Sequence, residues 1–249
     1  MMTNSNNVPT VVLVHGWTYK HHVFSKLTNE FVTAGYRVYA PDMPGFGGEP
    51  EPTGVWGVYD YANWLSSYVS NISGPVILLG HSFGGAICAL VATKNLSNVL
   101  GLVVVSPSGI RTTSTVKRIR FFIIHSISHI LKLPGLLAFR TRLQRVWYKI
   151  SGATDYAQAS VHMKNVLARV VSQDISSDLG NIHIPTLIIW AQNDTATPIS
   201  QSLVWRKNIP QSTYIEVAGA NHSFIYDAPQ LVIPAVNEFV QLAVGTQKQ

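Results

Sequence analysis

Ser82 lies in the segment Gly80-His-Ser-Phe-Gly84, which carries a glycine two positions to either side of the serine. The segment follows an apolar run at residues 76–79 and precedes a small-residue helical pattern at 86–93. This order predicts a strand, a sharp turn and a helix, in which a Cβ at Gly80 or Gly84 would collide with the adjoining strand or helix. Such a turn holds the serine hydroxyl out into solvent, where it can act as a nucleophile.

Two downstream residues could activate this serine. A serine hydroxyl is a poor nucleophile at neutral pH, so it needs a histidine to take its proton and a carboxylate to orient that histidine. Asp194 follows the apolar run at 184–190 in a turn-rich loop, and His222 follows the strand-like segment 213–219. We therefore predict Ser82 as nucleophile, His222 as general base and Asp194 as orienting acid. The alternative for Asp194 is that it caps a helix expected to begin near Pro198.

The chain order Ser82, Asp194, His222, with each residue at the carboxyl end of a different expected strand, resembles the α/β-hydrolase family. The similarity extends over nearly the whole chain and is greatest to serine-nucleophile, esterase-like members with a lid. Residues 11–17 look like the family's first strand and His-Gly loop, and residues 42–47 look like its D-x-P-G-x-G segment. The resemblance implies that the oxyanion is held by the backbone N–H groups of Trp17 and Phe83.

The resemblance also implies an activity, namely hydrolysis of carboxylic esters with short to medium apolar acyl groups, or of aromatic esters, through an acyl-enzyme. Hydrolysis of C–C bonds, lactones or thioesters remains open within the same fold, although C–C hydrolases often carry tryptophan where this chain has Ser223. A different class of function is a small-molecule-binding receptor or scaffold that keeps the hydrolase fold.

Alternating apolar runs and amphipathic segments predict an α/β fold with a mostly parallel, doubly wound sheet. We expect strands near 10–15, 36–41, 76–81, 101–106, 185–191 and 213–218, and helices near 21–34, 56–70, 84–95, 198–208 and 229–243. About eight residues precede the first strand, which is too few for the antiparallel hairpin that usually opens the family's sheet. The expected sheet therefore has about six strands.

The strand–helix rhythm lapses after the fourth expected strand. We predict that residues 1–110 and 185–249 form the core and that residues 111–184 form a helical lid over the active site. Nine of the eighteen Lys and Arg residues fall between Arg111 and Lys149, and no Asp or Glu lies between Asp60 and Asp155. This basic segment is interpreted as a solvated outer face; the alternatives are attraction of anionic substrates and weak association with an acidic membrane surface.

Composition excludes several other classes. The 249 residues, 47% of them hydrophobic, suit one well-cored domain with an insertion. The single cysteine, Cys88, cannot form an intramolecular disulfide, and no metal-binding or nucleotide-binding pattern is present, so neither a metal nor a cofactor is expected. No nucleic-acid-binding motif accompanies the positive charge, so the expected partner is a small-molecule acyl substrate. The first residues lack the pattern of a signal peptide, which makes the cytoplasm the expected location. The oligomeric state stays open.

Overall fold

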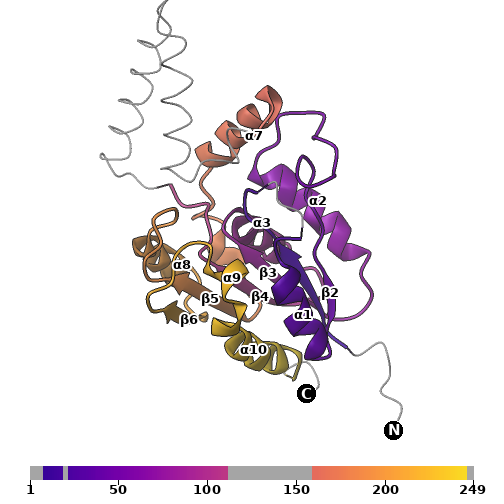
Figure 1. The fold of residues 1–249 in the computed structure, drawn as a ribbon, viewed down its shortest axis with the longest axis vertical. Coiled ribbons are helices and arrows are strands. Elements are labelled where there is room, and N and C mark those ends of the chain that lie inside the picture. The colour runs from indigo at the N-terminus through magenta and orange to yellow at the C-terminus, as the bar shows by residue number, and fades with distance from the viewer. Residues whose placement is uncertain (1–7, 19–21, 112–158, 246–249) are drawn as a thin grey trace, which may run out of the picture.

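The computed structural model describes residues 8–18, 22–111 and 159–245. Most of the expected lid, including eight of the nine Lys and Arg residues from Arg111 to Lys149, lies outside these ranges. The strands are β1 Thr10–Val14, β2 Arg37–Tyr39, β3 Val76–His81, β4 Val99–Val105, β5 Thr186–Ala191 and β6 Thr213–Val217. They form one six-stranded sheet in the order β2-β1-β3-β4-β5-β6, and every neighbouring pair is parallel (Figure 1). The prediction of a six-stranded, doubly wound parallel sheet is confirmed.

Helices cover both faces of the sheet. The α-helices are α1 Ser25–Thr33, α2 Val58–Ser70, α3 Phe83–Ala92, α7 Val161–Ser172, α8 Ser202–Asn208, α9 Phe224–Asp227 and α10 Ile233–Gly245. Three of the expected helices, α1, α8 and α10, begin about four residues later than expected; short 3-10 turns at Ile199–Gln201 and Pro229–Leu231 precede α8 and α10. Along the long axis of the molecule, α7 lies at the end opposite α10 (Figure 1).

Side chains of successive strand residues alternate between two hydrophobic clusters, as the twofold periodicity of a strand requires. In β1, Val12 and Val14 join the cluster that contains α2 and α3, whereas Val11 and Leu13 join the cluster that contains α1 and α10. All four side chains are fully buried. Because both faces are covered, the strands read as continuous apolar runs, which is typical of parallel sheets.

The segment that follows β4 and the segment that precedes β5 lie side by side at Gly109, Arg111, Asp174 and Ile175, which together are called the neck. The backbone N–H of Arg111 donates to Asp174 Oδ2 at 2.7 Å, and the N–H of Ile175 donates to the Gly109 carbonyl at 2.9 Å. Gly109 has a φ of +96°, and a Cβ on it would press against the Ile175 side chain at 2.8 Å. These contacts fasten the segment after β4 to the segment before β5, beside the sheet.

No α-helix in the described ranges combines the length and the apolar character that crossing a bilayer requires.

Candidate active site

Ser82 forms a strained turn between the end of β3 and the start of α3. Its backbone has φ 52° and ψ −115°, a conformation that costs a residue with a side chain on the order of 1–3 kcal/mol. The turn is fastened to the end of β4 and to the segment after it: Ser82 N–H donates to the Val105 carbonyl at 3.0 Å, and the Ser82 carbonyl accepts from Ser108 N–H at 3.0 Å. The surrounding structure thus holds the serine in a conformation that it would not adopt by itself.

The two glycines that flank the serine are required by close backbone packing. A Cβ on Gly80 would collide with the Gly84 carbonyl in α3, and a Cβ on Gly84 would collide with the Val14 carbonyl at the end of β1. Both contacts are with backbone atoms, which cannot move aside as a flexible side chain could. The collision expected from the sequence therefore occurs, and it explains the spacing of the motif.

The structure brings together the three side chains that the sequence singles out. His222 Nε2 lies 3.0 Å from Ser82 Oγ, and His222 Nδ1 lies 2.7 Å from Asp194 Oδ2. Since a carboxylate only accepts hydrogen bonds, Nδ1 carries the proton in neutral His222, and Nε2 presents a lone pair to the serine hydroxyl. The three residues come from the turns that follow β3, β5 and β6, which meet at the carboxyl edge of the sheet.

Asp194 uses its two carboxylate oxygens for different purposes. Oδ1 accepts the backbone N–H groups of Ala196 at 2.9 Å and Thr197 at 2.8 Å, while Oδ2 faces His222. Burial favours the neutral acid, yet hydrogen bonding and attraction to His222, together with the Thr197 N–H, lower the pKa of Asp194 below its ordinary value. The helical turn at 199–201 begins after Pro198 with no side-chain cap, so the alternative that Asp194 caps a helix is wrong.

Two further histidines lie buried beside this site. His15 Nε2 accepts from Met43 N–H at 3.2 Å and His15 Nδ1 lies 2.7 Å from the Gly16 carbonyl, which ties the loop after β1 to the loop after β2. Burial lowers the pKa of His15, although the Gly16 carbonyl and Asp42 act in the opposite direction. Burial also lowers the pKa of His81, to about 3. Both side chains are therefore neutral at physiological pH.

The two expected oxyanion donors flank the serine from different segments. Phe83 is the first residue of α3, where N–H groups have no partner inside the helix. Trp17 follows His15-Gly16, and its ring packs against the Phe83 ring with centroids 5.6 Å apart. In the part of the chain that the structure describes, neither backbone N–H donates a hydrogen bond to a protein group.

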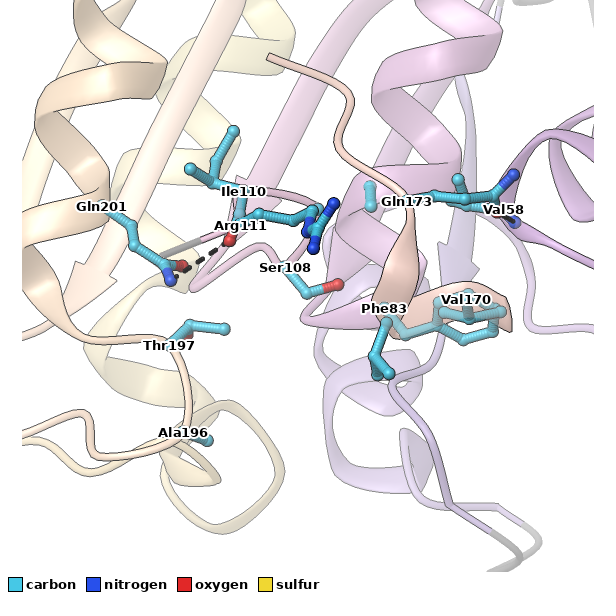
Figure 2. A pocket seen from close by; sticks show the side chains of 13 residues that line it. Val58, Phe83, Ser108, Ile110, Arg111, Val170, Gln173, Ala196, Thr197 and Gln201 are labelled. Carbon is cyan, nitrogen blue, oxygen red and sulfur yellow. Dashed lines mark hydrogen bonds between the residues drawn. The ribbon is translucent and has the colours of Figure 1, made fainter. Parts of the chain in front are cut away.

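A pocket of about 330 Å³ adjoins the site. Phe83, next to the serine, and Thr197, which lies beside Asp194 and His222, belong to its wall, whereas Ser82 and His222 themselves do not. Figure 2 shows Gln201 and Ile110 along one side, with the Gln201 amide donating to the Ile110 carbonyl at 3.4 Å. Its remaining lining residues are Val58, Ala86, Ser108, Gly109, Arg111, Val170, Val171, Gln173 and Ala196. The pocket therefore lies between the serine turn, the loop that carries Asp194, and α7.

Sequence reasoning missed Thr197 and Gln201. The Thr197 hydroxyl oxygen lies 3.1 Å from Asp194 Oδ2 and 3.0 Å from the Ser106 carbonyl oxygen, which share its single proton, and it lies 3.4 Å from His222 Nδ1. The sequence around Thr197 indicates a turn, but a turn signal does not show that a hydroxyl will meet the acid. Gln201 lies in an expected helix, and nothing in its spacing indicates that it lines a pocket.

Within residues 8–18, 22–111 and 159–245, no group of three or more His, Cys, Asp or Glu side chains is arranged to hold a metal ion. The donor set of the candidate site, one hydroxyl, one imidazole and one carboxylate in a hydrogen-bonded row, matches proton transfer between neighbouring groups.

Comparison with known proteins identifies the family of the chain. The sequence profile of the alpha/beta hydrolase family matches residues 11–235. A pyrethroid hydrolase from Sphingobium wenxiniae is 25% identical over 93% of this chain and 88% of its own length. An AB hydrolase superfamily protein from Bacillus subtilis, YisY, is 23% identical over 92% of this chain and 90% of its own.

Solved structures of similar fold include enzymes named as esterases. The esterase EaEST from Exiguobacterium antarcticum superposes with a TM-score of 0.71 at 22% identity, covering 94% of this chain and 92% of that protein. A lipase-esterase related protein from Clostridium acetobutylicum gives 0.70 at 22% identity, covering 94% and 95%. With the profile match over most of its length and the parallel sheet described above, the chain belongs to the α/β-hydrolase family.

Proposed function

We propose that this protein is a serine hydrolase that cleaves carboxylic esters through an acyl-enzyme. The observation that carries the proposal is the continuous row of hydrogen bonds from Asp194 through His222 to Ser82, at distances of 2.7 Å and 3.0 Å. Both distances lie within the range in which a base can take a proton from a nucleophile. The relationship to a pyrethroid hydrolase and to other α/β hydrolases supports a hydrolytic activity.

The first half-reaction forms the acyl-enzyme. Ser82 Oγ attacks the ester carbonyl carbon while its proton moves to His222 Nε2, and Asp194 stabilises the imidazolium that results. The negative charge that develops on the carbonyl oxygen is met by the backbone N–H groups of Trp17 and Phe83. The C–O bond to the alcohol then breaks, and His222 returns the proton to the departing alkoxide.

The second half-reaction restores the enzyme. A water molecule gives a proton to His222 Nε2 as its oxygen attacks the acyl carbon, and the oxyanion forms again at the same two N–H groups. Collapse of this intermediate breaks the bond to Ser82 Oγ, which takes the proton back, and the carboxylic acid leaves. No redox step occurs, and the only co-reactant is water.

The pocket beside Phe83 is proposed to receive an apolar part of the substrate. Its aliphatic and aromatic wall includes Phe83, Ile110 and Val170, and its volume of about 330 Å³ lies near the lower end for ligand pockets, roughly 300–1,000 Å³. Such a space favours short to medium acyl chains or an aromatic ring over a long lipid chain.

The chemistry is tested by hydrolysis of p-nitrophenyl esters from acetate to dodecanoate. Replacement of the nucleophile in Ser82→Ala should reduce kcat by on the order of a millionfold. The control Ser67→Ala removes an exposed α2 hydroxyl that donates to the Asn63 carbonyl at 3.2 Å, and it should match the unsubstituted protein. Turnover that persists in Ser82→Ala would refute the mechanism.

A fluorophosphonate probe separates the alternatives. Labelling of Ser82 without turnover of any ester would point to C–C, lactone or thioester substrates. No labelling and no turnover would favour a binding protein that keeps the fold.

The pocket assignment has its own matched pair on α7. Val170 lines the pocket, whereas Val161, in the first turn of the same helix, is 78% exposed. Val170→Trp should shorten the preferred acyl chain, while Val161→Trp should leave the chain-length profile unchanged. Identical profiles for both variants would show that the acyl group binds elsewhere.

A further inference from the structure

The hydroxyl of Tyr226 lies where three segments of the active site meet. Tyr226 belongs to α9, four residues after His222 in the sequence. Its oxygen lies 3.1 Å from Gly16 N and 2.6 Å from His81 Nδ1, and the opposite ring nitrogen of His81, Nε2, lies 2.9 Å from the His222 carbonyl oxygen. These contacts join the loop after β1, the end of β3 and the segment after β6.

The direction of each hydrogen bond follows from the chemistry of the groups. The His222 carbonyl can only accept, so His81 Nε2 carries the proton. His81 is 2% exposed and neutral, so its Nδ1 has a lone pair and must accept from the Tyr226 hydroxyl. The Tyr226 oxygen is then left to accept the Gly16 N–H. One arrangement of protons therefore satisfies every group in this row of hydrogen bonds.

Both ends of this row of hydrogen bonds reach the proposed catalytic residues. One end is the main chain of His222, the proposed base. The other end is Gly16, directly before Trp17, the proposed oxyanion donor. A Cβ on Gly16 would lie 3.1 Å from His81 Nδ1, 3.3 Å from Ser82 Cβ and 3.3 Å from the Tyr226 oxygen. These three groups therefore pack closely around Gly16.

We propose that Tyr226 is a positioning residue, which through His81 and Gly16 sets the His222 main chain and the Trp17 N–H in register with Ser82. This proposal rests on the proposed function, because it assigns Tyr226 a part in the same reaction. Tyr226 does not belong to the described lining of the pocket, so it acts on the geometry of the reacting groups and leaves substrate binding to other residues.

Kinetics of Tyr226→Phe test the proposal. The substitution keeps the ring but removes the hydroxyl, so Gly16 N–H and His81 Nδ1 lose their shared partner. We expect kcat to fall roughly ten- to a hundredfold, the size of effect that follows when reacting groups are misplaced by about 1 Å. KM should stay within about twofold, because binding is not altered. The rate of fluorophosphonate labelling should fall with kcat.

A second tyrosine provides the control. The Tyr59 hydroxyl donates to Asp178 at 2.9 Å on the exposed side of α2, so Tyr59→Phe also removes one tyrosine hydrogen bond. We expect its kcat to match that of the unsubstituted protein. Equal kcat values for the two variants, or a loss in Tyr226→Phe confined to KM, would overturn the proposal.

A measurement without substitution keeps the proposal testable if Tyr226→Phe fails to fold. Histidine ¹⁵N NMR of the unsubstituted protein should show His81 as the neutral Nε2–H tautomer with a hydrogen-bonded Nδ1. The opposite tautomer would break the proposed chain and refute the role of Tyr226. If the unsubstituted protein neither hydrolyses esters nor reacts with the fluorophosphonate probe, the proposed function is refuted instead. The NMR experiment needs no activity, so the two failures can be told apart.

Discussion

Acidification from pH 7 to pH 5 should destabilise the native protein by about 2 kcal/mol through His81 alone. Burial lowers the pKa of His81 from 6.5 to about 3, so the folded protein does not protonate it within this range. The unfolded chain does bind a proton there, and each pKa unit between 6.5 and the experimental pH lowers the free energy of unfolding by about 1.4 kcal/mol. The contribution of neutral His81 to the free energy of unfolding is fully present above pH 6.5 and is lost progressively as the pH falls toward 3.

Chemical unfolding, followed by tryptophan fluorescence at both pH values, measures this effect. His81→Gln is the matched variant, because its amide can still donate to the His222 carbonyl but does not titrate. The unsubstituted protein should lose about 2 kcal/mol more than His81→Gln between pH 7 and pH 5, whatever the absolute stability of the variant. Equal losses in the two proteins would show that His81 is protonated in the fold, and would refute the proton arrangement inferred for it.

Three further outcomes are expected. Asp194→Asn should keep its turn hydrogen bonds and its fold but lose about 10⁴-fold in kcat, since an amide no longer holds His222 in the required tautomer; near-normal turnover would reject Asp194 as the acid. Gly84→Ala should unfold at lower denaturant than the unsubstituted protein or fail to accumulate, because the new Cβ would collide with the Val14 carbonyl; an unchanged unfolding midpoint would contradict the packing described. Burial raises the pKa of Cys88, so iodoacetamide at pH 8 should alkylate this thiol only in unfolded protein. Mass spectrometry measures the modification, and rapid alkylation of the native protein would argue against the burial of Cys88.

Much of the fold follows from local sequence patterns. The expected strands at β3 and β5 match the observed ones within a residue, because both faces of these strands are covered and each strand contains a continuous run of four or more apolar residues. The strand expected at 36–41 is shorter: β2 covers Arg37–Tyr39 at the edge of the sheet, and Pro41 lacks the N–H needed for further pairing.

The positions of Ser82, Asp194 and His222 at the ends of strands could also be inferred from the sequence. Parallel strands carry their carboxyl ends to one edge, so residues far apart in the chain are expected to meet there. Tyr226 could not be inferred in this way. Its contact with Gly16 spans 210 positions and depends on the orientation of a short helix, about which the local pattern of residues 224–227 says nothing. The wall of the pocket is equally non-local, because it combines five separate segments of the chain.

The neck formed by Gly109, Arg111, Asp174 and Ile175 holds both ends of the intervening segment, residues 112–173, at one place beside the sheet. Because the two ends of this segment are hydrogen-bonded to each other, its length can change without altering the distance between the points where it joins the core. The three proposed catalytic residues all lie outside this segment, whereas Val170, Val171 and Gln173 of the pocket wall lie inside it. Grafting a different segment at this neck would therefore change which molecules are accepted while leaving the chemistry intact.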